Sequence, residues 1–260
     1  MLHYSISGNG HETLVLLHGF MENSSIWEDM QKHLSKSFNI LKIDLPGHGK
    51  SEMIAEVQTM ELMALEVRNV LDELQLKHVH LLGHSMGGYI SVAFAEKYPE
   101  YLKTLTLFFS TFLPDDDEKK DQRTKSFRIV KEAFGHYVNA GISNLFNPNE
   151  LDILEGKIEL AKKIALTTNN LGALACLKGM IERPNRKRVL ETFSGKIVLI
   201  SGNHDNAVKT EKTLKSLPDR TNIKSYVLDC GHNGHWERPS ICAEIINIEL
   251  MHNFPGKWAM

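Results

Sequence analysis

The sequence has little of what marks secreted or membrane-inserted proteins. Its 260 residues include only three cysteines, Cys176, Cys230 and Cys242, widely spaced and without a CxxC pair. An odd, scattered set argues against a disulfide framework, so we expect reduced thiols. The apolar runs are strand-sized, which predicts no membrane span, and the opening "MLHYSISGNG" lacks the basic-then-apolar pattern of a secretory signal. We therefore expect a cytoplasmic protein that does not bind membranes.

An excess of charge of either sign is also missing. Lysine and arginine number 30 and aspartate and glutamate 32, for a formal net charge of −2. No basic surface that would attract a phosphate backbone is expected, so nucleic acid is not a predicted partner. Hydrophobic residues make up 42% of the chain, which is ordinary for a globular domain of this length. Whether the protein is a monomer or a homodimer is left open.

The sequence contains several short apolar runs that are bounded by glycine or polar residues. Such runs are typical of strands buried on both faces of a parallel sheet. They occupy residues 13–18, 39–44, 78–83, 104–109, 196–202 and 224–228. Between them lie helical patterns, among them residues 86–98, which Pro99 ends. Alternating strands and helices predict a doubly wound α/β fold with a mostly parallel sheet.

The alternation breaks once, between residues 114 and 188, where only helical patterns occur. We predict a helical lid there, inserted into a core formed by residues 1–113 and 189–260. Its acidic start at residues 115–117 suits the positive end of a helix dipole. Its basic end "RPNRKR", residues 183–188, is expected to be a solvated connection out of the lid, and contact with a carboxylate is the alternative.

The stretch "GHSMG" places Ser85 between Gly83 and Gly87, after an apolar strand and before a helix. This is the setting in which the pattern G-x-S-x-G indicates a nucleophile. A sharp strand-to-helix turn strains the serine backbone and brings neighbouring segments close, so the flanking positions require glycine. A glycine-rich turn that merely contains serine is the alternative.

A serine hydroxyl needs a base and a group that orients the base. Asp205 follows the strand at 196–202, and His232 follows the next strand. Loops after parallel strands emerge at one sheet edge, so both can converge on Ser85. His235 is the competing base, His204 a weaker one, and Asp205 can also be read as a simple turn residue.

An acyl-transfer site also needs donors for the oxygen that becomes negative. The backbone N–H of Met86, directly after the nucleophile, is one candidate. The second is the N–H of Phe20, because Gly19 allows the loop after an early strand to bend toward the site.

No cofactor or metal is expected. The glycines after the strand at 78–83 match neither a dinucleotide-binding loop nor a Walker loop. His232, His235 and Glu237 offer three ligand types, but they lie in a predicted loop and lack the HExxH pattern of a zinc-binding helix.

With these motifs the chain resembles the α/β-hydrolase superfamily. The resemblance rests on "HGF" at 18–20, "DLPGHGKS" at 44–51, "GHSMGG" at 83–88 and "GHNGHWERP" at 231–239, which occur in the family's order. The second and fourth are similar to those of the capped esterase, enol-lactonase and C–C hydrolase branch. The resemblance implies a serine nucleophile, Ser85, and argues against dehalogenase or epoxide hydrolase chemistry, which uses aspartate at this position.

The resemblance further implies that His232 is the base and Asp205 the orienting acid. The predicted reaction is two-step acyl transfer, which hydrolyses an ester, lactone or thioester of a small-molecule substrate. C–C bond hydrolysis and a menaquinone-pathway type of lyase reaction with the same triad remain open. So does a small-molecule receptor with a vestigial triad. The sequence departs from the family at its short opening strand "HYSIS" and in the acid loop "GNHDNAV".

Overall fold

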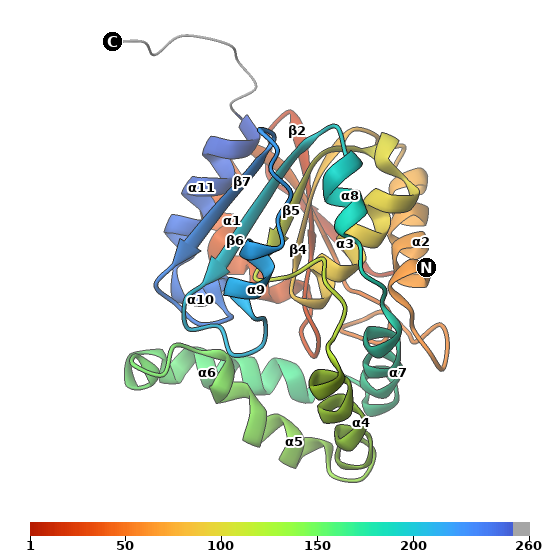
Figure 1. The fold of residues 1–260 in the computed structure, drawn as a ribbon, viewed down its shortest axis with the longest axis vertical. Helices are drawn as coiled ribbons and strands as arrows, with labels where there is room; N and C mark the ends of the chain where they lie inside the picture. Colours follow the sequence, from red (N-terminus) through yellow and green to blue (C-terminus); the bar gives the residue numbers. More distant parts are fainter. Residues whose placement is uncertain (252–260) are drawn as a thin grey trace.

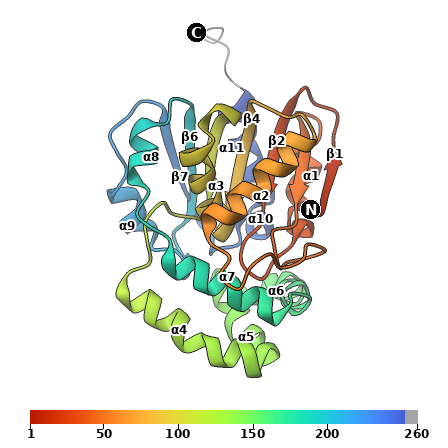
Figure 2. The ribbon, with the colours of Figure 1, turned by 90° about the vertical axis from the view of Figure 1, so that its right-hand side faces the viewer.

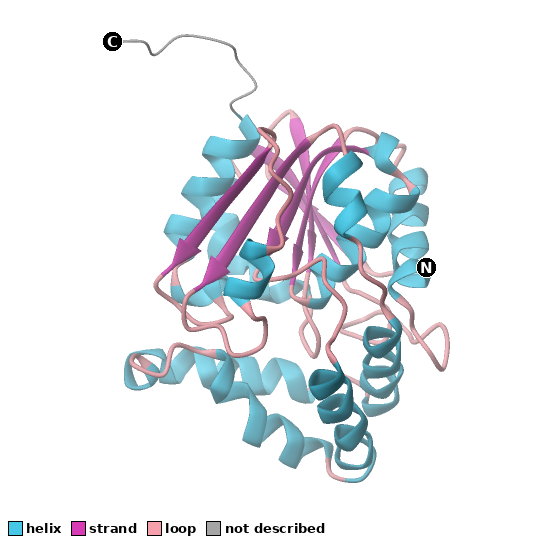
Figure 3. Ribbon diagram, viewed as in Figure 1, coloured by secondary structure: helices cyan, strands magenta, loops and turns pink. Residues whose placement is uncertain are grey.

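In a computed structural model, which describes residues 1–251, a seven-stranded sheet forms the centre of the molecule (Figures 1 and 3). The strand order is β1-β3-β2-β4-β5-β6-β7. The strands are β1 (Tyr4–Ser7), β2 (Glu12–Leu17), β3 (Phe38–Ile43), β4 (Val79–His84), β5 (Leu102–Phe108), β6 (Lys196–Gly202) and β7 (Ile223–Leu228). Only β1 is antiparallel to its neighbour, β3; the other pairs are parallel. The predicted doubly wound, mostly parallel fold is confirmed.

The strands form where the sequence is apolar on both faces. Every residue of β4 is buried, which a strand in the middle of a covered parallel sheet requires. The short segment that opens the chain forms a single edge strand, β1, which pairs with β3 and not with β2.

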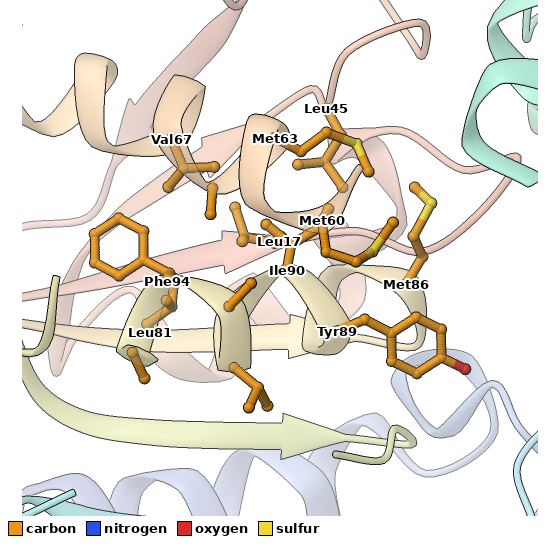
Figure 4. Packing of buried hydrophobic residues seen from close by; sticks show 14 of the residues in the cluster. Leu17, Leu45, Met60, Met63, Val67, Leu81, Met86, Tyr89, Ile90 and Phe94 are labelled. Carbon is orange, nitrogen blue, oxygen red and sulfur yellow. The ribbon is translucent and has the colours of Figure 1, made fainter. Parts of the chain in front are cut away.

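Helices cover both faces of the sheet (Figure 2). On one face α2 (Met60–Glu73), α3 (Met86–Lys97) and α8 (Lys187–Thr192) share a hydrophobic cluster with the strands. Figure 4 shows Met60 and Val67 of α2 beside Ile90 and Phe94 of α3, above Leu81 of β4. On the other face α1 (Glu28–Leu34) and α11 (Pro239–Met251) form a second cluster. Packing on both faces holds the sheet in place, and it therefore also holds the edge at which the loops after the strands emerge.

A helical insertion separates β5 from β6. It contains α4 (Asp117–Glu132), α5 (Phe134–Gly141), the 3-10 helix η3 (Ile142–Leu145), α6 (Leu151–Leu166) and α7 (Asn170–Glu182). These helices lie beyond the arrowheads of the strands, at the carboxyl edge of the sheet (Figures 1 and 2). The helix α8, which begins at Lys187, packs against α3 of the core. Two small helices of the core, α9 (Thr210–Lys215) and α10 (Gly234–Glu237), follow β6 and β7.

The basic segment that leaves the insertion is not a solvated connection, so that prediction is wrong for its first two arginines. The Arg183 guanidinium is buried and lies 2.7 Å from Asp115. The Arg186 guanidinium is also buried and pairs with Glu61 and with Glu96, the latter at 3.1 Å. These carboxylates come from distant parts of the chain, and partners of this kind allow a charge to be buried.

The acidic start of the insertion divides between two roles. Asp116 caps α4 and accepts a hydrogen bond from the backbone N–H of Lys119 at 3.1 Å, as a helix N-terminus favours. Asp115 instead turns inward to the guanidinium of Arg123, at 2.6 Å, as well as to that of Arg183. This carboxylate therefore joins both ends of the insertion.

Cys176, Cys230 and Cys242 are free and buried, as expected for reduced thiols. Within residues 1–251, no helix has the length and apolar character needed to cross a membrane.

Candidate active site

Ser85 lies at the turn between β4 and α3, with a strained backbone at φ 50° and ψ −115°. A Cβ atom on Gly83 would lie 2.2 Å from the carbonyl oxygen of Gly87, and one on Gly87 would lie 2.5 Å from that of His18. No side chain fits at either position, so the steric reason predicted for both glycines is confirmed. The turn holds Ser85 at the start of α3, where backbone N–H groups are free.

The structure brings Asp205 and His232 together at the same edge of the sheet. The Nδ1 atom of His232 lies 2.8 Å from Oδ2 of Asp205. The other oxygen of Asp205 accepts the backbone N–H groups of Ala207 and Val208, at 2.8 and 2.9 Å. Asp205 is therefore a turn residue and the partner of His232 at once, since each oxygen serves one purpose.

Ser85 and His232 line one cavity of about 200 Å³, together with Phe20. Across the described residues, 1–251, the backbone N–H groups of Phe20 and Met86 donate no hydrogen bond to a protein acceptor. Free donors near a serine hydroxyl are what an oxyanion site requires.

The competing histidines are not joined to Asp205, although His235 lies beside His84. His235 is fully buried, with Trp27 and Trp236 packed against its ring, and neither of its ring nitrogens has a hydrogen-bond partner among the described residues. Burial lowers the pKa of His235 well below its ordinary value. His204 faces the exposed Asp229, with 3.1 Å between Nε2 and Oδ1. Neither ring contacts Asp205.

The Glu237 carboxylate is fully engaged by the backbone. It accepts the N–H groups of Gly231, Asn233 and Asn147, at 2.8, 3.1 and 3.0 Å. Over residues 1–251, no cluster of three or more His, Cys, Asp or Glu side chains is arranged to hold a metal ion.

Sequence reasoning missed Glu22, which also lines the cavity. Its Oε2 atom accepts the backbone N–H of Gly19 at 2.6 Å and lies 2.8 Å from Nδ1 of His84. Burial alone would raise the pKa of Glu22, but the neighbouring imidazole of His84 lowers it to about 2. The one available signal was an acidic residue in the loop that carries Phe20.

Two cationic side chains from α4, Lys119 and Arg123, line the same cavity as Ser85 and were also missed. Arg123 is paired with Asp115, whereas Lys119 has no ion-pair partner within residues 1–251. A neighbouring cavity of about 270 Å³ shares Lys119 and Tyr89 with the first. Only folding of the insertion over the sheet places these charges near Ser85.

Comparison with known proteins adds four likenesses, two of them to solved structures. Residues 12–128 match the family model described as alpha/beta hydrolase fold. A 2-hydroxy-6-oxononadienedioate/2-hydroxy-6-oxononatrienedioate hydrolase of Pseudomonas putida is 27% identical, over 96% of this chain and 92% of its own.

Two solved structures are similar over the whole architecture. A malate-bound thermophilic esterase from Thermogutta terrifontis superimposes with a TM-score of 0.88 at 28% identity, over 96% of this chain and 93% of the other. An enol-lactonase from Burkholderia xenovorans LB400 has a TM-score of 0.87 at 21% identity, over 96% of each chain, a likeness of fold.

Proposed function

This chain belongs to the α/β-hydrolase superfamily, and we propose that it is a serine hydrolase that cleaves an ester, lactone or thioester of a small molecule. In this proposal Ser85 is the nucleophile, His232 the base and Asp205 the orienting acid. One observation carries it: the 2.8 Å contact of Asp205 with His232 lies at the cavity that the strained Ser85 also lines.

The first step forms an acyl-enzyme. Nε2 of His232 takes the hydroxyl proton of Ser85 while the oxygen attacks the substrate carbonyl carbon. The carbonyl oxygen gains the negative charge and accepts hydrogen bonds from the N–H groups of Phe20 and Met86. When the tetrahedral intermediate collapses, His232 returns the proton to the departing alcohol.

The second step repeats this with water. Water attacks the ester carbonyl of the acyl-enzyme while His232 takes a proton from it. His232 then protonates Ser85 as the acid product leaves. Asp205 keeps the Nδ1 proton of His232 in place and stabilises the imidazolium formed in each step.

C–C bond hydrolysis is the second candidate. It is favoured by the name of the Pseudomonas putida relative, a hydrolase of a dioate, and by Lys119, the cation at the cavity that has no ion-pair partner within residues 1–251. A carboxylate-bearing substrate would suit that charge. The discriminating experiment compares turnover of a 2-hydroxy-6-oxo dienedioate with turnover of neutral nitrophenyl esters.

A fluorophosphonate probe tests the nucleophile directly. We expect prompt labelling of the wild type and none of Ser85→Ala. An unlabelled wild type would contradict catalysis and favour a receptor with a vestigial triad. A panel of short-chain and long-chain nitrophenyl esters then defines the acyl group.

A further inference from the structure

Glu22 and His84 connect three segments that come from distant parts of the sequence. Glu22 lies in the loop after β2, His84 ends β4 directly before Ser85, and His232 lies in the loop after β7. The three are joined by hydrogen bonds, and the proposed mechanism uses neither Glu22 nor the side chain of His84.

Two of these bonds end on the same carboxylate oxygen of Glu22. Oε2 of Glu22 is the acceptor for the backbone N–H of Gly19, at 2.6 Å, and for Nδ1 of His84, at 2.8 Å. At the other end of the ring, Nε2 of His84 lies 3.0 Å from the backbone carbonyl oxygen of His232. One ring thus joins the loop of Phe20, the serine turn and the histidine loop.

The acceptors determine the protonation of His84. A carbonyl oxygen cannot donate, so Nε2 of His84 must carry a proton. The Gly19 N–H already points at Oε2 of Glu22, which disfavours a proton on that oxygen and leaves one on Nδ1. His84 is then a doubly protonated imidazolium.

The surroundings favour the same charge state. Burial would lower the pKa of His84, but the Glu22 carboxylate raises it above its ordinary value. Near the pair lie His18, His232, His235 and Asp205. Burial lowers the pKa of both His18 and His235, and the Asp205 carboxylate also raises the pKa of His84. Glu22 is also largely buried, with 12% of its side chain exposed, so its charge is satisfied mainly by His84 and Gly19.

We propose that the Glu22–His84 ion pair is a positioning unit. It holds the loop after β2, which carries Phe20, and the loop after β7, which carries His232, in register with Ser85. It touches no reacting atom. It acts through the N–H of Phe20, next to Gly19, and through the backbone of His232. The inference rests on the proposed function only for the roles of Phe20, Ser85 and His232.

Glutamine at position 22 would be nearly isosteric but cannot preserve all three bonds. If its oxygen takes the place of Oε2, it accepts from Gly19 and from Nδ1 of a neutral His84, whose Nε2 then has no proton for His232. If its amide nitrogen takes that place, it opposes the N–H of Gly19. One of the three contacts is lost either way, because a neutral imidazole has one N–H.

Ester kinetics of Glu22→Gln are therefore expected to separate kcat from KM. We expect kcat to fall about 10- to 100-fold, as for a small misplacement of reacting groups, and KM to change less than about threefold. The matched control is Glu249→Gln. Glu249 is a buried carboxylate that accepts from Tyr226 at 2.5 Å and pairs with Lys196, the first residue of β6, away from the site. Its kcat should stay within about twofold of the wild type.

Two further measurements separate positioning from folding. His84→Gln should lower kcat like Glu22→Gln. The double variant leaves no unpaired buried charge, so its kcat should be at least that of the less active single variant. In ¹⁵N-histidine NMR, the wild type should show one imidazole with both nitrogens protonated at pH 8, and this signal should vanish in Glu22→Gln.

The possible failures are distinguishable. A wild type without turnover of any ester overturns the proposed function. A Glu22→Gln variant with wild-type kcat, or one that behaves like Glu249→Gln, overturns the positioning unit. A neutral His84 in the wild type overturns the ion pair whatever the activity.

Discussion

Oδ2 of Asp205 contacts Nδ1 of His232 at 2.8 Å, although the two residues lie in separate loops, after β6 and after β7. The contact fixes which ring nitrogen is engaged. Because Nδ1 faces the carboxylate, Nε2 is the nitrogen left for the proposed proton transfer with Ser85.

Replacing Asp205 by asparagine should lower ester turnover about 10³- to 10⁴-fold, because an amide N–H aimed at Nδ1 moves the proton of His232 to Nε2. Asp229→Asn is the control, since this carboxylate is exposed and contacts only Asn203 and His204 among the residues described. Steady-state ester hydrolysis measures both. Equal losses of turnover in the two variants would contradict the role of Asp205 as the orienting acid.

Truncation of the two neighbouring histidines should differ in its effect on activity. His232→Ala should abolish turnover and also lower stability, because the ring is buried and its loss leaves Oδ2 of Asp205 without its partner. His235→Ala should keep kcat within about threefold but lose roughly 1–3 kcal/mol of unfolding free energy, because a fully buried ring is removed. Urea unfolding and ester kinetics on both variants check this. An active His232→Ala beside an inactive His235→Ala would reverse the base assignment.

Alanine should be damaging at Gly87 and harmless at Gly156. A Cβ on Gly87 would lie 2.5 Å from backbone oxygens of β2 and the following loop, whereas one on Gly156, in α6, meets no atom within 4 Å. We expect Gly87→Ala to cost about 2–4 kcal/mol and to lose fluorophosphonate labelling. Gly156→Ala should gain about 0.5–1 kcal/mol from helix propensity. Thermal unfolding of both proteins decides, and a stable, labelled Gly87→Ala would refute the steric account.

The carboxylate that joins both ends of the insertion should make stability depend on pH. Burial would raise the pKa of Asp115, but Arg123 and Arg183 hold it below its ordinary value of 3.8. A carboxyl group whose pKa is lowered by folding stabilises the protein at pH values above its ordinary pKa. This stabilisation is lost as the pH falls through the folded-state pKa. Asp115→Asn should therefore be less stable than the wild type by roughly 3 kcal/mol at pH 6, with a difference that shrinks below pH 3.8.

Urea unfolding at pH 6 and pH 3 measures this dependence. The control is Asp121→Asn, on the same helix, whose exposed pair with Lys125 should contribute less than about 0.5 kcal/mol. A difference between Asp115→Asn and the wild type that grows as pH falls would have the wrong sign.

Lys119 should select for negative charge in the substrate. Lys119→Met is expected to raise KM about tenfold for a nitrophenyl hemisuccinate and to leave KM for a neutral nitrophenyl ester unchanged. Lys125→Met, an exposed lysine on the same helix, should affect neither. Parallel changes with both esters in Lys119→Met would exclude charge recognition by Lys119.

Much of the fold could be predicted, because local sequence carries the signal. Residues 78–83 form an apolar run, so a strand buried on both faces of a parallel sheet was expected there, and β4, at Val79–His84, confirms it within one residue. The expected turn at Ser85 likewise rests on neighbours in sequence, Gly83 and Gly87, whose missing side chains are needed within a few residues.

The buried charges could not be predicted. Arg183 and Arg186 read as part of a solvated basic run, yet both are buried on carboxylates 68 or more residues away. Glu22 gave equally little sign of its contact with His84, 62 residues further on. The local sequence around a charged residue does not show whether its side chain is solvated or paired with a distant residue.

The sequence by itself determined the alternation of strands and helices, and it supplied the residue types of the proposed serine nucleophile, base and acid. Those properties depend on periodicity, on steric limits at glycine and on motifs a few residues long. Only the tertiary structure decided that Asp205 meets His232, that His235 does not, and that Glu22 holds His84. Those contacts depend on which loops the parallel sheet brings to its carboxyl edge, and on the desolvation that makes each buried charge require a specific partner.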